Sequence, residues 1–292
     1  WLRAFRASAR RQVTNSLLSR LSVPAWSKCV EHRRFALRSF STSQGSTGLT
    51  ADKLKTLQEA VFVAARSGMT DVIKKLHASG VNVNLPDKDG MTALIRAAAG
   101  GHIETVKELK NLGSDINHAN ALGMTAIMLA AAFGQSKIIK DLVDLGARVN
   151  EGDANGVTPV MSAAIQGHAP MIQTLADLGA DVNARSTDGM TAFLLACTAG
   201  HAEVLRQLPT LGADASAVDD LRRNGLMFAA RGAHRDVLPR LLPTMDVHAA
   251  DQSGWTALMH AALGGSPDCV RALRQAGADP QARDAKGLTP LM

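Results

Sequence analysis

The sequence contains few of the residues that build disulfide frameworks, metal centres and aromatic cores. Tyrosine is absent, aromatic residues make up 3% of the chain, and only three cysteines occur in 292 residues. Cys29, Cys197 and Cys269 are widely spaced, which argues against a disulfide framework and against a CxxC-type zinc site. Cys29 and His32 are three residues apart, but no second ligand pair accompanies them. We therefore expect no metal site, and we interpret Cys197 and Cys269 as small core residues in a reducing compartment.

Long apolar runs and catalytic motifs are also lacking. The stretch 126–133 is a typical apolar run and is far shorter than the ~18 residues that span a bilayer, so we expect no transmembrane helix within the chain. There is no GK[ST] phosphate loop, no GxSxG and no HExxH. We therefore expect this segment to be non-enzymatic and to need no cofactor.

The positive charge is confined to one end of the chain. The net charge is +6, yet residues 1–45 alone hold nine basic side chains and one acid, a net of +8, so the remaining residues carry a net of −2. A basic balance would otherwise suggest nucleic acid or an anionic surface as the partner. Because this remainder is slightly acidic and has few aromatic residues, we expect no nucleic-acid binding by residues 46–292.

Residues 1–45 have the composition of an organelle transit peptide, rich in Arg and Ser and poor in acids. The stretch 33–43 resembles a mitochondrial matrix-protease site, with Arg38 at the third position before a cut between Phe40 and Ser41. We expect a mitochondrial matrix location, with a plastid or cytoplasmic location as alternatives. The other interpretation is a basic arm that touches RNA, DNA or acidic lipid. Because Met69 is the first methionine, we expect the native start to lie upstream.

From about residue 54 the chain repeats itself with a period of 33. Three series of residues recur at this step, with one residue missing near Met245: Gly90, 123, 156, 189, 254 and 287; Gly68, 101, 134, 167 and 200, then Ala233 and Gly265; and Gly80, 113, 146, 179 and 212, then Met245 and Gly277. A period of this length is typical of a stacked solenoid, in which one unit cannot bury its apolar face alone.

Each unit can be interpreted as a turn followed by two helices. An Asp, Asn or Ser three residues before the first-series Gly can close a turn, and Thr two residues after that Gly is suited to the N-cap of a short helix. The second-series Gly ends the first helix, and the third-series Gly ends the second helix in the left-handed conformation.

These motifs resemble those of the ankyrin-repeat family. Residues 91–102 (MTALIRAAAGGH), Thr158–Met161 (TPVM), Gly179–Asn183 (GADVN) and Thr289–Met292 (TPLM) match its Thr-Pro-Leu-His, Gly-His and Gly-Ala-Asp-Val-Asn signatures. The resemblance implies an all-α solenoid of helix–turn–helix units with β-turn or hairpin fingers. We expect a leader (1–45), a linker (46–53) and an array (54–292), whose units span 54–84, 85–117, 118–150, 151–183, 184–216, 217–248, 249–281 and, in part, 282–292.

Two departures from the family pattern stand out. The His of the tetrapeptide is replaced throughout by Ile95, Met128, Met161, Leu194, Met227, Met259 and Met292, so we expect apolar packing there. The unit 217–248 is degenerate: Arg222 replaces its turn Gly, Asn224 replaces its Thr, and Pro239 and Pro243 fall in or after its second helix. Because an interior Pro costs ~3 kcal/mol, we predict that this unit is the weakest joint of the stack.

The resemblance implies that fingertips and inner-helix faces bind protein partners. The recurrent Gly-His histidines (His102, His168, His201, His234) are expected to serve the inter-helix turn. The side chain that follows each turn Gly should point into the concave groove of the array, and side chains at the ends of the inner helices should line the same groove. We predict an apolar strip with an Arg pair, and its members are Met91, Met124, Phe133, Val157, Ile165, Met190, Arg223, Arg231 and Trp255. The alternative is that these residues pack against the next finger.

We therefore predict a protein-interaction scaffold or adaptor that binds an apolar or amphipathic segment, one bearing an acidic group, of another protein. One alternative is the interaction or regulatory region of a larger enzyme whose catalytic domain lies outside the fragment. A second alternative is an RNA-associated protein that uses the basic N-terminal arm.

Overall fold

The computed structural model describes residues 51–290, with the side chains of 51–53 left aside. Its helices form two rows. The inner row is α4 (Ala51–Arg66), α6 (Ala93–Ala99), α8 (Ala126–Ala132), α10 (Pro159–Ile165), α12 (Ala192–Ala199), α14 (Gly225–Arg231) and α16 (Ala257–Gly264). The outer row is α5 (Thr70–Ala78), α7 (Ile103–Asn111), α9 (Ser136–Asp144), α11 (Ala169–Asp177), α13 (Ala202–Gln207), α15 (Leu238–Leu241) and α17 (Pro267–Gln275), with the 3₁₀ turns η2 (Leu208–Leu211) and η3 (Arg235–Val237).

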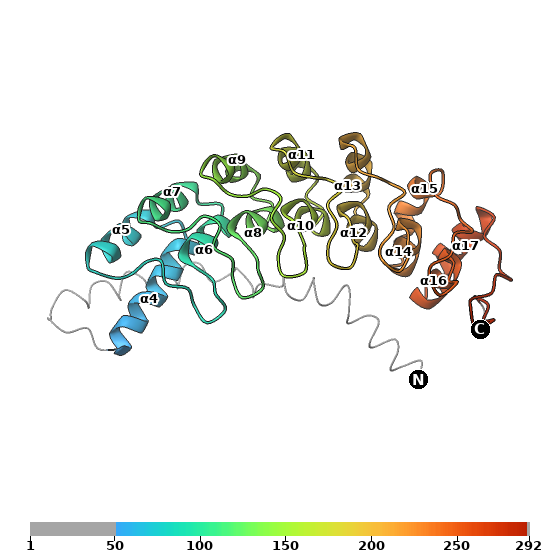
Figure 1. Cartoon of the computed structure of the whole chain (residues 1–292), viewed down its shortest axis with the longest axis horizontal. Coiled ribbons are helices and arrows are strands. Elements are labelled where there is room, and N and C mark those ends of the chain that lie inside the picture. The colour runs from blue at the N-terminus through green and yellow to red at the C-terminus, as the bar shows by residue number, and fades with distance from the viewer. Residues whose placement is uncertain (1–50, 291–292) are drawn as a thin grey trace.

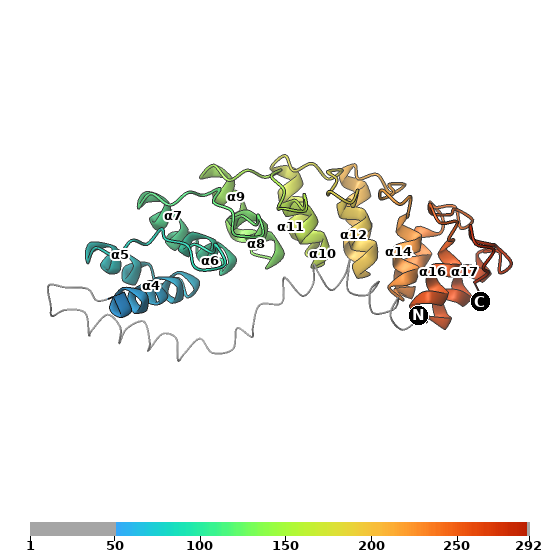
Figure 2. The same cartoon turned by 60° about the horizontal axis from the view of Figure 1, so that its bottom comes forward.

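The units stack side by side into an arch. The outer helices lie on its convex side, and the inner helices and the finger loops lie on its concave side (Figures 1 and 2). Each inner helix packs against the inner helices before and after it and against its own outer helix. This is the helical repeat solenoid that the 33-residue period predicts.

Six of the seven inner helices are short, and most of their residues are buried. Most have seven or eight residues, too few to be stable alone in water, so packing against neighbouring units must supply their stability. The residues that replace the family's tetrapeptide His are fully buried at Ile95, Met128 and Leu194. The prediction of apolar packing at this position is thus confirmed there.

The finger loops are closed by the turn residue that the sequence indicates. Oδ1 of Asp87 accepts from the backbone N–H of Asp89 and of Met91, both at 2.9 Å, and the equivalent Asp or Asn does the same in the later fingers. Ser186 accepts only from the N–H of Met190, at 3.0 Å. Successive fingertips are joined by a backbone hydrogen bond, such as Ala154 N to Leu122 O at 3.1 Å. Gly123 is needed in this geometry because its φ is +79° and a Cβ would lie 2.5 Å from Ala154 N.

The predicted Thr N-caps are confirmed in part. Thr92 accepts from the N–H of Ile95, and Thr191 accepts from the N–H of Leu194, both at 3.3 Å. The prediction is wrong for the hydroxyls of Thr125, Thr158 and Thr256, which are buried in the same N-cap position without a hydrogen-bond partner. The extended backbone of these caps is held by the closed finger and by core packing instead.

The backbone of the degenerate unit follows the same course as that of the other units, but two of its residues adopt a strained conformation. Arg222 and Ala233 take the places of two glycines and adopt φ values of 60° and 62°, in the left-handed region that glycine favours. Asn224 replaces Thr as an N-cap and accepts from the N–H of Met227 at 3.0 Å. The outer helix is reduced to η3 and the four-residue α15.

The array begins earlier than the unit boundary expected from the sequence. α4 starts at Ala51, inside the stretch 46–53 assigned to the linker, and with 16 residues it is the longest helix of residues 51–290. Its N-terminal turns lie where later units have a finger, and Gln58 Nε2 donates to Leu85 O of the next finger at 3.3 Å. None of the helices between residues 51 and 290 has the length and apolar character that crossing a bilayer demands.

Candidate partner-binding surface

The structure divides the predicted binding residues into two groups. Met124, Val157, Ile165 and Met190 lie in the hydrophobic core and are 8%, 6%, 5% and 4% exposed. An apolar side chain so little exposed offers almost no area to a partner. These four residues pack between fingers and helices, as the alternative interpretation of the strip states, and they are not included in the candidate surface.

The second group is half-buried and lies along the inner row. It contains Met91, Phe133, Arg223, Arg231 and Trp255. Met91 belongs to the second unit and Phe133, the C-cap of α8, to the third. Arg223, Arg231 and Trp255 belong to the sixth and seventh units, in α14 and in the fingers beside it. The candidate surface thus has an apolar part near the N-terminal end and a cationic and aromatic part near the C-terminal end.

We call this second part the Arg–Trp cluster: Arg223, Phe228, Arg231, Trp255 and His260, with the carboxylates of Asp219, Asp251 and Asp284. Arg223 is held within its own unit. Its Nε donates to Asp219 Oδ2 at 2.7 Å, and its guanidinium carbon lies 4.8 Å from the ring centroid of Phe228. Asp219 is 1% exposed, so the pair is largely screened from water. An ion pair and a cation–π contact together fix this guanidinium.

The seventh unit contributes a second chain of contacts. Nε2 of His260 lies 3.0 Å from Oδ2 of Asp251, and Trp255 Nε1 donates to Asp284 Oδ2 of the next finger at 3.0 Å. The Trp255 and His260 rings meet edge to face at 5.5 Å. Trp255 is therefore held in place before any partner arrives.

The ionisation of the Asp251–His260 pair follows from burial. Burial lowers the pKa of His260 below its usual value and outweighs the attraction of Asp251, while Arg231 and Arg223 lower it further. Burial opposes ionisation of Asp251, but hydrogen bonds from His260 and from the N–H groups of Trp255 and Ser253 outweigh it and lower its pKa. The pair is thus a neutral imidazole that donates to a carboxylate.

Arg231 differs from the other charged groups of the cluster. It is the last residue of α14, and its guanidinium makes no hydrogen bond or ion pair with the residues between 51 and 290. Burial and the nearby charge of Arg223 lower its pKa, and the attraction of Asp251 does not offset them. The fold thus holds this cation in surroundings less favourable than water.

Arg96 shows how an inner-row arginine is neutralised near the other end of the array. Its guanidinium is ion-paired with Asp87 and lies 5.0 Å over the ring centroid of Phe62. Hydrogen bonds from Met91 N–H and Arg96 overcome the burial of Asp87 and lower its pKa. The sequence interpretation missed Arg96 and His260. Both lie nine residues after the turn Asp, where other units have Leu129 or Leu195, so a polar residue at this register was the available signal.

The Gly-His histidines are structural. Nε2 of His201 lies 2.9 Å from Ile165 O, the carbonyl of the preceding inner helix, and because a carbonyl only accepts, the ring donates. His102, His168 and His234 make the same contact with Arg66 O, Ala132 O and Thr198 O, and Gln135 Nε2 replaces the ring with a bond to Ala99 O at 3.2 Å. The prediction of a structural role for these side chains is confirmed, and the contact joins two successive units.

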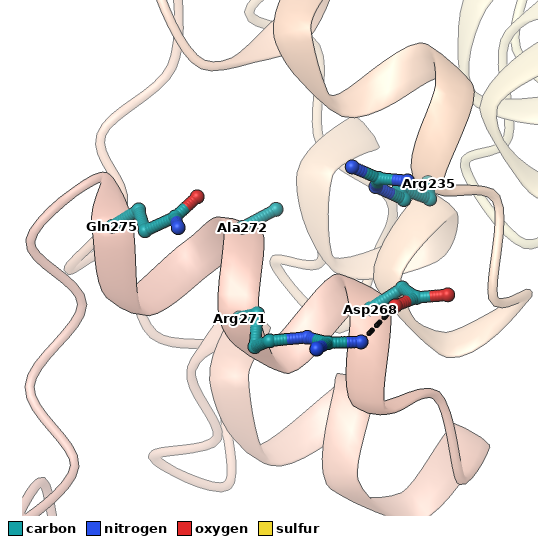
Figure 3. Close-up of a pocket in the computed structure, with 5 residues that line it drawn as sticks. All are labelled: Arg235, Asp268, Arg271, Ala272 and Gln275. Atoms are coloured by element: carbon teal, nitrogen blue, oxygen red, sulfur yellow. Dashed lines mark hydrogen bonds and ion pairs between the residues drawn. The ribbon is translucent and has the colours of Figure 1, made fainter.

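A shallow depression of about 290 Å³ lies on the outer side, between η3 and α17 (Figure 3). Arg235 faces it from η3, and Asp268, Arg271, Ala272 and Gln275 line it from α17. Arg271 and Asp268, both on α17, are ion-paired with each other and are largely exposed. Such an open, polar depression does not exclude water, so it lacks the dry environment in which catalytic groups work.

The remaining sequence predictions concern metal ligation, the cysteines and processing. Within the part of the chain that the structure describes, no three His, Cys, Asp or Glu side chains are placed to hold a metal ion. Cys197 and Cys269 are buried there, as predicted for core residues. Cys29, His32 and the processing residues Arg38, Phe40 and Ser41 lie outside the described residues.

One family model matches most of this chain. The model described as Ankyrin repeats (3 copies) matches three overlapping stretches, residues 61–153, 146–219 and 207–284. The matched stretches together run from α4 to the last finger, and they include the degenerate unit and the whole Arg–Trp cluster.

Proposed function

This chain belongs to the ankyrin-repeat family, whose arrays are protein–protein interaction modules, and from that premise we propose that it is a non-enzymatic scaffold that binds a partner segment on its concave face. The observation that carries the proposal is the position of the half-buried residues Met91, Phe133, Arg223, Arg231 and Trp255 along the inner row. Aromatic and Arg side chains dominate the binding energy of interfaces, and methionine adapts to varied partners. The partner segment is apolar or amphipathic.

Site-specific photo-crosslinking tests this proposal. A benzoylphenylalanine is placed at Phe133, on the concave side, or at Gln275, which is exposed on the outer helix α17, and the full chain is irradiated in cell extract. We expect discrete protein adducts from position 133 and none of the same species from position 275. Adducts only from position 275, or the same adducts from both positions, would contradict concave binding.

A matched substitution separates binding from folding. Phe133→Glu places a charge on the concave surface, and Gln275→Glu adds the same charge on the outer face. Because Phe133 also packs against the core, both variants are compared at a temperature where circular dichroism shows them folded. There we expect Phe133→Glu to weaken binding of the crosslinked partner and Gln275→Glu to leave it unchanged. Partner affinity equal in both variants would count against the surface.

We also propose that residues 1–45 are a mitochondrial presequence. The proposal is supported by the eight arginines against one acid and by the register of Arg38, Phe40 and Ser41. A fusion of residues 1–45, preceded by Met, to a fluorescent protein should be imported by isolated mitochondria and shortened. Replacing Arg3, Arg6 and Arg10 by Gln should reduce import. Retention in the supernatant of both fusions would instead favour the basic-arm interpretation.

A further inference from the structure

We propose that Arg231 is the docking point for a side-chain carboxylate, an Asp or Glu of the partner segment. The inference rests on the proposed function and deepens it, because it places one required chemical group of the partner at one residue of the Arg–Trp cluster. It is carried by the hydrogen-bond state of each charged group in that cluster.

Both oxygens of all three carboxylates in the cluster already accept hydrogen bonds. Asp219 accepts from Leu221 N and Arg223 N through Oδ1 and from the Arg223 guanidinium through Oδ2. Asp251 accepts from two backbone N–H groups and from His260, and Asp284 from two backbone N–H groups and from Trp255. None of the three carboxylates therefore has an oxygen without a hydrogen bond that could pair with a further cation.

Arg231 is left with five N–H donors and no acceptor from residues 51–290. Its guanidinium is half-buried and is repelled by Arg223, so water solvates it incompletely. A carboxylate that reaches it can accept two parallel N–H bonds from the planar group. The same carboxylate lies near Arg223 and reduces the repulsion between the two guanidiniums.

The array does not need a cation at this position. At the same register, five of the other inner helices have the uncharged residues Ala99, Ala132, Ile165, Thr198 and Leu263; α4, at the N-terminal end of the array, ends in Arg66. The repeat fold therefore does not require an arginine at position 231. A half-buried charge without an internal partner is costly, so its presence points to an external one.

The surroundings favour a carboxylate over a phosphate group. Asp219 and Asp251 lie in the same cluster, and their negative charges disfavour a dianion more than a monoanion. Trp255, fixed by Asp284 and His260, provides a half-buried aromatic surface in the same cluster. The partner segment thus presents an acidic residue close to an apolar one.

Selection from a peptide library tests the inference. A phage library of random 12-residue peptides is selected on the full chain, and enriched peptides are synthesised with amidated C-termini and titrated by fluorescence polarisation. Each Asp or Glu of a peptide is replaced by Asn or Gln. The protein variants are Arg231→Gln, Arg231→Lys and the matched control Arg271→Gln, which removes an exposed, ion-paired arginine of α17.

The inference is supported if the losses of peptide affinity caused by the peptide change and by the protein change are not additive. Replacing one acid of the peptide should weaken binding roughly 10- to 100-fold, Arg231→Gln should weaken it by a similar factor, and the two changes together should cost no more than either alone. Arg231→Lys should recover part of the affinity, and Arg271→Gln should have no effect. In addition, selection on Arg231→Glu should enrich Lys or Arg in place of the acid.

Other results overturn the inference and separate it from the proposed function. Peptides that bind Arg231→Gln as tightly as the unchanged protein, yet lose affinity for Phe133→Glu, would overturn the role of Arg231 and leave concave binding intact. Binding that needs a free C-terminal carboxylate would overturn the assignment to an acidic side chain. No enriched peptide at all would contradict docking of a short segment and, with it, this inference.

Discussion

Nε2 of His260 lies 3.0 Å from Oδ2 of Asp251, and this contact joins the turn of the seventh finger to inner helix α16. The two side chains are 3% and 9% exposed. Burial lowers the pKa of His260, so the imidazole is neutral and donates to the carboxylate. Its Nδ1 is buried without a hydrogen-bond partner, so a proton added there would find no acceptor.

This arrangement predicts a pH-dependent stability. Because the pKa of His260 is lower in the folded protein than its unfolded value of about 6.5, the unfolded chain takes up the proton first as the pH falls. The contribution of His260 is complete above pH ~6.5 and is lost below it, by at most about 1.4 kcal/mol per pH unit. Urea unfolding at a series of pH values between 7.5 and 5 measures this slope.

The control is His260→Gln, which keeps a hydrogen-bond donor toward Asp251 and removes the titration. Asp251, whose pKa is also lowered, loses its contribution only at lower pH, below its unfolded value near 3.8. Between pH 7.5 and 5 the unchanged protein should therefore lose more stability than the variant. Parallel slopes would show that the pKa of His260 is the same in the folded and the unfolded chain, which would contradict the prediction.

The histidine contacts between units predict a difference between two substitutions. His201→Ala removes the donor to Ile165 O and leaves this carbonyl without its partner, so it should lower the free energy of unfolding by about 1–3 kcal/mol. His201→Gln should cost less, because Gln135 makes the equivalent bond to Ala99 O in another unit. Chemical denaturation of both variants tests this, and equal losses would mean that ring packing, not the hydrogen bond, matters.

The repeat register accounts for what could be predicted from sequence. The glycine series, the turn Asp and the Gly-His pair have roles set by local backbone geometry, which repeats every 33 residues. Exposure does not follow from register alone, since Met91 is half-buried while Met124 and Met190, at the same position, are covered by neighbouring units. The contact between Trp255 and Asp284 spans two fingers, so it depends on how the units stack.

The two non-glycine residues with left-handed backbone predict stabilising substitutions. Ala233→Gly and Arg222→Gly relieve φ values of 62° and 60°, so each should raise the free energy of unfolding by about 1 kcal/mol. Ala176→Gly in the outer helix α11 is the matched control, and it should lower that free energy by about 1 kcal/mol. A loss of stability in Ala233→Gly would show that chain flexibility outweighs the relieved strain.

The sixth unit should open before its neighbours. Two kinds of contact that join other units are replaced at the sixth unit. Ser216 stands where the earlier loops have Asn and donates to Asp214 instead. Ser266 stands where other units have the His of the Gly-His pair and caps α17 instead. The outer helix is reduced to η3 and α15, a single turn that contains Pro239. Amide hydrogen exchange should therefore be faster over residues 235–245 than over α9 and α11, and Ala233→Gly should slow it. Uniform protection across residues 205–250 would contradict the prediction. It would mean that packing between α14 and α16 stabilises the sixth unit as much as the inter-unit hydrogen bonds stabilise the other units.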